Sequence, residues 1–179
     1  MKKKLLIFLL LISTFAKAET KTYYYDSGKK KSQGEMTDGK YEGKWIFWFE
    51  SGKVSNEGVY KNGLYEGIWI KYFENGQAES IGKYSDNVQD SAWVFYFEDG
   101  KLSSKGSFEK GQAIGTWTYY YNNGNKKTEG SFVDGTWQGF WTDWYEDGKP
   151  KTKIHWYKGL QHGPAIYWDE SGQKTCYQY

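Results

Sequence analysis

A tryptophan recurs at every twenty-fourth residue through the middle of this chain. The tryptophans are Trp45, Trp69, Trp93, Trp117 and Trp141, and Ala165 takes the sixth place. Glycines keep the same spacing at Gly28, Gly52, Gly76, Gly100, Gly124, Gly148 and Gly172. A constant period in this range is typical of an array of supersecondary units and not of a conventional globular core.

One period predicts two strands and two turns. The segment from Gly115 to Gly135 contains an aromatic strand, the turn Asn123-Gly124, and a polar strand with Gly130 at its centre. Asn-Gly between two strand-like runs favours a type I′ hairpin turn, which needs positive φ at both central residues. We therefore expect an all-β fold, an elongated single-layer antiparallel meander of about seven 24-residue β-hairpin repeats.

The turn positions also predict the register. A two-residue turn at Ser51-Gly52 pairs Glu50 with Lys53 and sets Trp45 opposite Gly58. The same arithmetic pairs Trp69 with Gly82, Trp93 with Gly106 and Trp117 with Gly130. An aromatic ring that lies over a cross-strand glycine fills the space beside it and fixes the register. The prediction explains why glycines occupy strand centres, where they otherwise weaken a sheet.

Departures from the repeat gather at its two ends. Lys21 and Ala165 stand in the tryptophan column, and Ile154 replaces a mid-strand glycine. Atypical terminal repeats are expected where an array must be capped. Within the array, Asn87 replaces a turn glycine, and asparagine tolerates positive φ better than most residues.

The first 18 residues have the pattern of a secretory signal peptide. Three lysines precede the apolar run from Leu5 to Ile12, and Ala16-Lys17-Ala18 forms a cleavage site before Glu19. The run is shorter than the ~20 residues that span a bilayer. We expect a mature chain of residues 19–179 that forms one repeat array without a transmembrane segment. It would be exported to the periplasm, the cell surface or the medium.

Composition argues against several classes of protein. All 24 basic residues are lysine, and beyond residue 18 there are 20 lysines and 22 acidic residues. Nucleic-acid binding relies on arginine and on a concentrated basic face, so we expect no nucleic-acid partner. Cys176 is the only cysteine, which leaves no internal disulfide to form.

No catalytic or metal-binding pattern emerges. Five glutamates share one column before the turns, namely Glu50, Glu74, Glu98, Glu146 and Glu170. Equivalent strands are ~10 Å apart, too far for these carboxylates to share a metal or a proton. His155 and His162 are the only histidines, and no third ligand type accompanies them. We expect a protein that is not an enzyme and holds no metal or cofactor.

The best candidate for function is a column of aromatic residues. Its members are Trp48, Tyr72, Tyr96, Tyr120, Trp144 and Trp168. Such a stripe, repeated every ~10 Å, is either the packed core of the meander or a platform that binds protein or sugar. The preceding column varies most and is expected to face solvent; it contains Phe47, Lys71, Phe95, Tyr119, Asp143 and Tyr167.

The chain resembles MORN-repeat proteins of the variant type, and is similar to the bacterial YwqK-like family. One copy of the shared motif consists of Gly67, Trp69, Tyr72, Phe73, Asn75, Gly76, Gly82 and Tyr84. The resemblance extends over nearly all of residues 19–179. It implies a β-hairpin meander without a catalytic centre, acting as a scaffold or binding module. YwqK-like chains often carry an antitoxin label, which the export signal here does not suit unless the toxin is in the envelope.

Membrane-surface association is disfavoured by the slight negative charge of residues 19–179 and by the lack of a basic amphipathic helix. Three functions follow from these observations and from the resemblance. The first is a non-enzymatic, exported protein–protein interaction or scaffold module at the cell envelope. The second is a glycan-binding or cell-wall-binding repeat protein, because cell-wall-binding repeats also use aromatic strands and Asn-Gly turns. The third is an antitoxin or immunity-type protein that neutralises a toxin. The partner is expected to be another protein, with a glycan as the alternative, and the oligomeric state is left open.

Overall fold

The computed structural model describes residues 17–178, and all of its regular structure is β-strand. The signal peptide expected at residues 1–18 lies almost entirely outside this range. The strands are β1 (Glu19–Tyr24), β2 (Lys30–Thr37), β3 (Lys40–Trp48), β4 (Val54–Lys61), β5 (Leu64–Tyr72), β6 (Ala78–Ser85), β7 (Val88–Tyr96), β8 (Leu102–Glu109), β9 (Gln112–Tyr120), β10 (Lys126–Val133), β11 (Thr136–Trp144), β12 (Pro150–Tyr157), β13 (Leu160–Trp168) and β14 (Lys174–Gln178).

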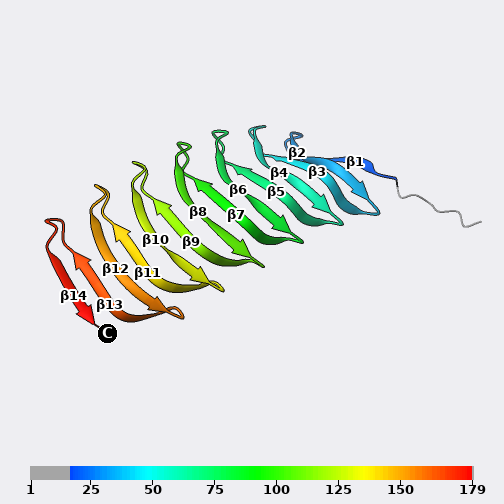
Figure 1. Cartoon of the computed structure of the whole chain (residues 1–179). Coiled ribbons are helices and arrows are strands. Elements are labelled where there is room, and N and C mark those ends of the chain that lie inside the picture. Colours follow the sequence, from blue (N-terminus) through cyan, green and yellow to red (C-terminus); the bar gives the residue numbers. More distant parts are fainter. Residues whose placement is uncertain (1–16, 179) are drawn as a thin grey trace, which may run out of the picture.

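The fourteen strands form one open sheet in which each strand pairs with its neighbours in sequence. All pairs are antiparallel, and the hairpins follow one another along the array from β1 to β14 (Figure 1). The prediction of a single-layer meander of hairpin repeats is confirmed. Among residues 17–178 there is no helix that is long and apolar enough to cross a membrane.

The two turns of each repeat differ in type. At Asn62-Gly63 both residues have positive φ, 53° and 85°, and Lys61 pairs with Leu64, as a type I′ turn requires. Asn87 adopts φ 67° at the corresponding position of the next turn of this kind, as its replacement of glycine suggested.

The expected two-residue turn at Ser51-Gly52 is wrong. The loop contains three residues, Glu50 to Gly52. The Phe49 N–H donates to the Lys53 carbonyl at 2.8 Å, and the Gly52 N–H donates to the Phe49 carbonyl at 2.9 Å. Only the last residue of the loop has positive φ, as in a type I turn followed by a left-handed glycine. Gly124 follows the same pattern, so the type I′ prediction for Asn123-Gly124 fails as well.

A β-bulge at Ser55 restores the predicted register. Trp48 pairs with Val54, but Phe47 pairs with Asn56, so Ser55 is an extra residue on β4. As a result Trp45 still lies opposite Gly58, and the three other predicted tryptophan–glycine pairs are also present. The three-residue loop and the bulge each shift the register by one residue, in opposite directions, so the predicted pairing at the tryptophan is kept.

The tryptophan that covers each glycine comes from the following hairpin, and not from the predicted cross-strand partner. The indole of Trp69 lies against Gly58, and its Nε1 donates to the Val59 carbonyl at 3.1 Å. The same contact is repeated in the pairs Trp45–Gly34, Trp93–Gly82, Trp117–Gly106 and Trp141–Gly130. Each indole thus joins two consecutive hairpins.

The core is the row of tryptophans on one face of the sheet. All five are buried, and Ala165, in the sixth place, is fully buried too. Other aromatic rings fill the spaces between them. Phe95 lies between Trp93 and Trp117, with ring centroids 5.8 Å and 6.2 Å away.

The variable column therefore faces the core wherever it is aromatic, and not solvent as expected. Phe47 contacts Trp45 and Trp69, and Tyr119 stacks on Trp117 at 6.0 Å. Burial raises the pKa of the Tyr119 hydroxyl, in keeping with this placement. The charged members differ: Lys71 is exposed, and Asp143 accepts hydrogen bonds from Thr128 and Thr152.

A candidate binding face on the sheet

The aromatic stripe lies on the face opposite the tryptophan row. Side chains alternate along a strand, so Trp48 points away from the face that Trp45 and Phe47 share. All six stripe residues are half-buried: Trp48, Tyr72, Tyr96, Tyr120, Trp144 and Trp168. The stripe is thus separate from the tryptophan row, and among residues 17–178 no second layer covers it (Figure 1).

Hydrogen bonds hold one member of the stripe in place. The Tyr72 hydroxyl donates to Glu57 Oε1 at 2.9 Å, and Lys44 Nζ lies 2.7 Å from Glu57 Oε2. The bond from Lys44 and the bond from Tyr72 lower the pKa of Glu57, so this carboxylate stays ionised at neutral pH. Burial, followed by the bond to Glu57, raises the pKa of Tyr72. The phenol is therefore a neutral, oriented group.

Lysines lie over the stripe near both ends of the array. Lys30 Nζ is 5.8 Å from the Trp48 ring centroid, and Lys126 Nζ is 5.6 Å from that of Trp144. Contacts of this kind are attractive at up to ~6 Å. The two indoles are thereby partly covered by the chain's own cations.

Aliphatic side chains extend the apolar surface beside the stripe. A hollow of about 300 Å³ is lined by Val59, Ile68 and Ile70, together with Lys44 and Glu57. Ile68 is 55% exposed. The stripe face therefore offers apolar contact beside the fixed pair Lys44–Glu57.

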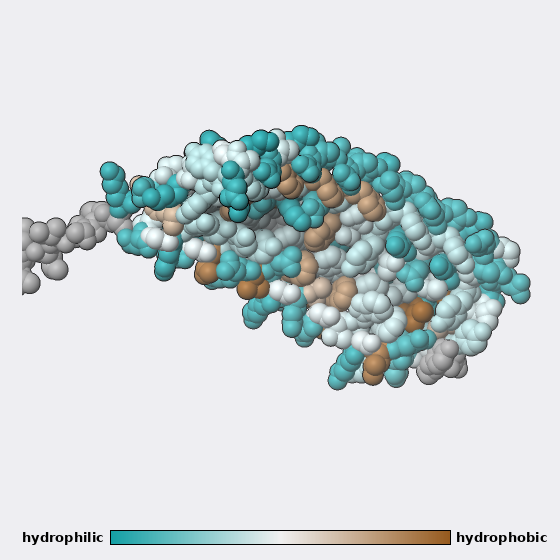
Figure 2. All heavy atoms as spheres, turned by 180° about the vertical axis from the view of Figure 1, so that it is seen from behind, coloured by the Kyte–Doolittle hydropathy of each residue, from teal (hydrophilic) through white to brown (hydrophobic). Residues whose placement is uncertain are grey.

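On the face of the molecule seen in the space-filling view, hydrophobic residues form a broken line, and hydrophilic residues cover the margins (Figure 2).

Residues 17–178 contain no group of three or more His, Cys, Asp or Glu side chains that could hold a metal ion. His155 and His162 are neighbours across the turn, but His155 Nδ1 is engaged with the His162 carbonyl at 2.8 Å. The His155 ring also packs edge-on against Phe140. This pair is accounted for by local packing.

A second hollow, at the C-terminal end of the array, was not predicted from the sequence. It has a volume of about 780 Å³ and is lined by Tyr145, Tyr167, Trp168, Asp169, Gln173, Thr175 and Tyr177. Of these, only Trp168 belongs to the predicted stripe. The sequence signal that points to this place is the irregularity of the last repeat.

The geometry defines the protein as a single-layer β-hairpin repeat protein with a packed tryptophan face and an uncovered aromatic face. Four consecutive segments match the family model of the MORN repeat variant, residues 41–62, 65–86, 89–110 and 114–134. The chain therefore contains MORN repeats of the variant type. The four segments lie in β3 to β10, the regular middle of the array.

Other comparisons add little. No curated protein matches the chain at a significant level. Among solved structures, a chain in the "Crystal structure of GtfA/B complex bound to UDP and GlcNAc" matches 63% of this chain with 10% identity and a TM-score of 0.26. The match spans only 22% of that chain. A likeness this distant carries no argument about function.

Proposed function

We propose that this protein is a non-enzymatic interaction or scaffold module that binds another protein through its aromatic stripe. The observation that carries the proposal is the position of the stripe. One half-buried aromatic side chain from each of six hairpins lies on the face that the tryptophan row leaves free. Equivalent strands repeat every ~10 Å, so the stripe is a regular, rigid row.

The chemistry of this face suits a protein partner. Tyrosine and tryptophan supply large contact areas at low entropic cost, and they dominate the energetics of protein interfaces. Ile70 and Val94 lie beside the stripe and are half-buried. Lys44 beside the stripe is paired with Glu57, so a partner would not leave these two charges unmatched.

We place this activity at the cell envelope because of the signal-peptide pattern in residues 1–18. Export also makes a cytoplasmic antitoxin role of the YwqK-like kind unsuitable, and an immunity-type role would require a toxin in the envelope. A glycan or cell-wall ligand on the stripe is the alternative. No feature of the stripe face specifically favours a toxin or a glycan over another protein partner.

The test starts with tagged protein, which is used to recover partners from envelope fractions beside a peptidoglycan-binding assay. The affinity of the recovered partner is then measured for Tyr96→Ala, Tyr120→Ala and the exposed control Glu109→Ala. As hot spots, the tyrosines should each cost ~2 kcal/mol or more, about a 30-fold loss of affinity. Full-strength binding by both folded tyrosine variants would place the partner elsewhere on the sheet.

A further inference from the structure

The last hairpin of the array lacks the bulge that the other hairpins share. In six hairpins the second strand carries one extra residue, at Lys31, Ser55, Glu79, Ser103, Lys127 and Lys151. Strands β13 and β14 pair without a shift from Trp168–Lys174 to Pro164–Gln178. Beyond the turn, β14 is thus displaced by one residue relative to the repeat.

A one-residue displacement turns every side chain to the other face of a sheet. Tyr177 pairs with Ala165, and Thr175 pairs with Tyr167. Both therefore point to the tryptophan face, whereas Lys153, the counterpart of Tyr177 one repeat earlier, pairs with Thr142 on the opposite face. The Tyr177 ring meets Tyr167 at 5.7 Å and 76°.

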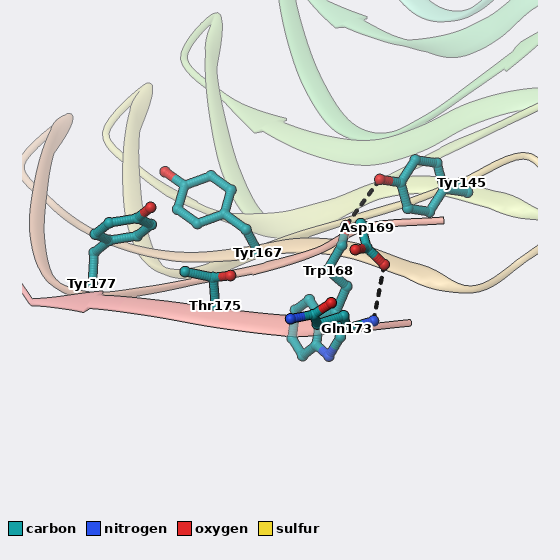
Figure 3. Close-up of a pocket in the computed structure, with 7 residues that line it drawn as sticks. All are labelled: Tyr145, Tyr167, Trp168, Asp169, Gln173, Thr175 and Tyr177. Carbon is teal, nitrogen blue, oxygen red and sulfur yellow. Dashed lines mark hydrogen bonds between the residues drawn. The ribbon is translucent and has the colours of Figure 1, made fainter. Parts of the chain in front are cut away.

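The displaced residues complete the hollow of about 780 Å³ at this end. Figure 3 shows the rings of Tyr145, Tyr167 and Tyr177 on one side of β14 and the indole of Trp168 on the other. The Tyr145 ring is fixed, since its hydroxyl donates to the Trp168 carbonyl at 2.8 Å. Pockets for small ligands usually have volumes of ~300–1,000 Å³, so this one suits a ligand of more than one ring.

Polar groups line the hollow together with the three tyrosine rings. Asp169 Oδ1 accepts bonds from Ser171 Oγ at 2.6 Å and from the Gln173 N–H at 2.9 Å. These bonds lower the pKa of Asp169, so the carboxylate is ionised and remains able to accept further hydrogen bonds. Thr175 adds a hydroxyl to the lining. Aromatic faces stack on the C–H faces of a pyranose, while carboxylates and hydroxyls bond its hydroxyl groups.

Two other occupants fit less well. An organic cation would compete with Lys151, whose Nζ already lies 5.4 Å from the Tyr145 ring centroid. A second copy stacked end to end would need a glycine on β14 and a tryptophan on its own β1. In the register of the structure those positions hold Tyr177 and Lys21, so the interlocking of tryptophan and glycine cannot continue.

We propose that this hollow binds a neutral oligosaccharide, with Tyr167 and Tyr177 as stacking platforms and with Asp169 and Thr175 as hydrogen-bonding groups. Of the stripe residues only Trp168 lines this site, and its proposed binding groups are all outside the stripe. It gives the array a second activity at its C-terminal end, with Tyr167 and Tyr177 on the face that elsewhere serves as the core.

Calorimetric titration of the protein with cellotetraose, maltotetraose and chitotetraose tests the proposal. We expect at least one of the three to bind, and Tyr167→Ala and Tyr177→Ala each to weaken that binding at least tenfold. Cys176→Ala is the matched control, because Cys176 is adjacent on β14 and points to the opposite face. It should leave the affinity unchanged, as should Tyr96→Ala on the stripe.

A second measurement does not depend on the stability of any variant. In the unaltered protein, the sugar that binds should shift the amide resonances of Thr175 and Tyr177 and leave that of Thr118 in place. Absence of binding by all three sugars at millimolar concentration overturns the proposal, as does binding with unshifted resonances at Thr175 and Tyr177. Displacement of the bound sugar by choline would instead show a site for cations. Loss of partner binding in Tyr96→Ala concerns the stripe alone, so the two proposals fail independently.

Discussion

The indole of Trp117 lies directly on Gly106, one strand before it in the sheet. A Cβ placed on Gly106 would overlap the fused ring of the indole, and even the indole Cγ would be only 2.6 Å away. The Trp117 Nε1 donates to the carbonyl of Ser107, the next residue, at 3.2 Å. Because Gly106 is on β8 and Trp117 on β9, the contact joins two hairpins and not the two strands of one.

The first prediction follows from this contact. Gly106→Val should destabilise the protein by about 3 kcal/mol, at the upper end of the usual cost of overpacking, because a rigid ring fills the space. Lys101→Val, at an exposed position, is the control and should have little effect. Urea unfolding measures both, and equal stabilities of the two variants would contradict the packing described.

The second prediction identifies which tryptophan Gly106 meets. In a Trp117→Ala background, Gly106→Val should cost much less than in the unaltered protein, because the clashing ring is gone. In a Trp93→Ala background its cost should persist, although Trp93 is the residue opposite Gly106 in the register. A double-mutant cycle measures the coupling energy of each pair. Stronger coupling to Trp93 would contradict the structure.

The third prediction separates the two aromatic faces. Phe95 and Tyr96 are neighbours on β7, but only Phe95 packs between two core tryptophans. Phe95→Ala should cost about 2–3 kcal/mol, less than for a fully buried ring. Tyr96→Ala should cost about 1 kcal/mol or less because its ring lies on the uncovered face. Thermal unfolding monitored by circular dichroism would decide, and a greater loss for Tyr96→Ala would make the stripe part of the core.

The fourth prediction concerns backbone strain at Ser91. This residue has φ 59°, where the equivalent positions of the neighbouring repeats, Gly67 and Gly115, have φ 67° and 62°. A left-handed conformation costs an ordinary residue about 1–2 kcal/mol, so Ser91→Gly should stabilise the protein by about 1 kcal/mol. Gly115→Ser should destabilise it similarly, although nothing lies within 4 Å of the added Cβ. A lower melting temperature for Ser91→Gly, or a higher one for Gly115→Ser, would refute the argument.

The fifth prediction is a pH dependence of stability. Bonds from Lys44 and Tyr72 hold the pKa of Glu57 below its ordinary value of 4.5. A carboxylate with a depressed pKa in the folded state stabilises the fold above its unfolded pKa, and that contribution is lost as the pH falls through the folded pKa. Glu57→Gln should therefore lose less stability than the unaltered protein between pH 7 and pH 3. Parallel urea titrations at the two pH values measure this, and identical losses would count against it.

Much of the fold follows from local sequence. The type I′ turn at Asn62-Gly63 was predictable because positive φ at two successive positions favours Asn and Gly over most residues. The pairing of Trp45 with Gly58 was predictable because the repeat fixes the number of residues between them. The loop at Ser51-Gly52 was not, since a three-residue loop with a later bulge gives the same register at the tryptophan as a two-residue loop without one.

The sequence by itself determined the period, the strand order and the register, because these depend on spacing and turn chemistry within one hairpin. Only the tertiary structure decided which hairpin supplies the ring that covers Gly106. Trp93 pairs with Gly106 within the same hairpin, whereas Trp117, on the next strand, supplies the ring. The tertiary structure also decided that the stripe, which strand alternation already placed opposite the tryptophan row, is left without a covering layer among the described residues, and that Tyr177 turns to the tryptophan face. The missing bulge on β14 has no signature in the period, and its effect appears only when the side chains of neighbouring strands are brought together.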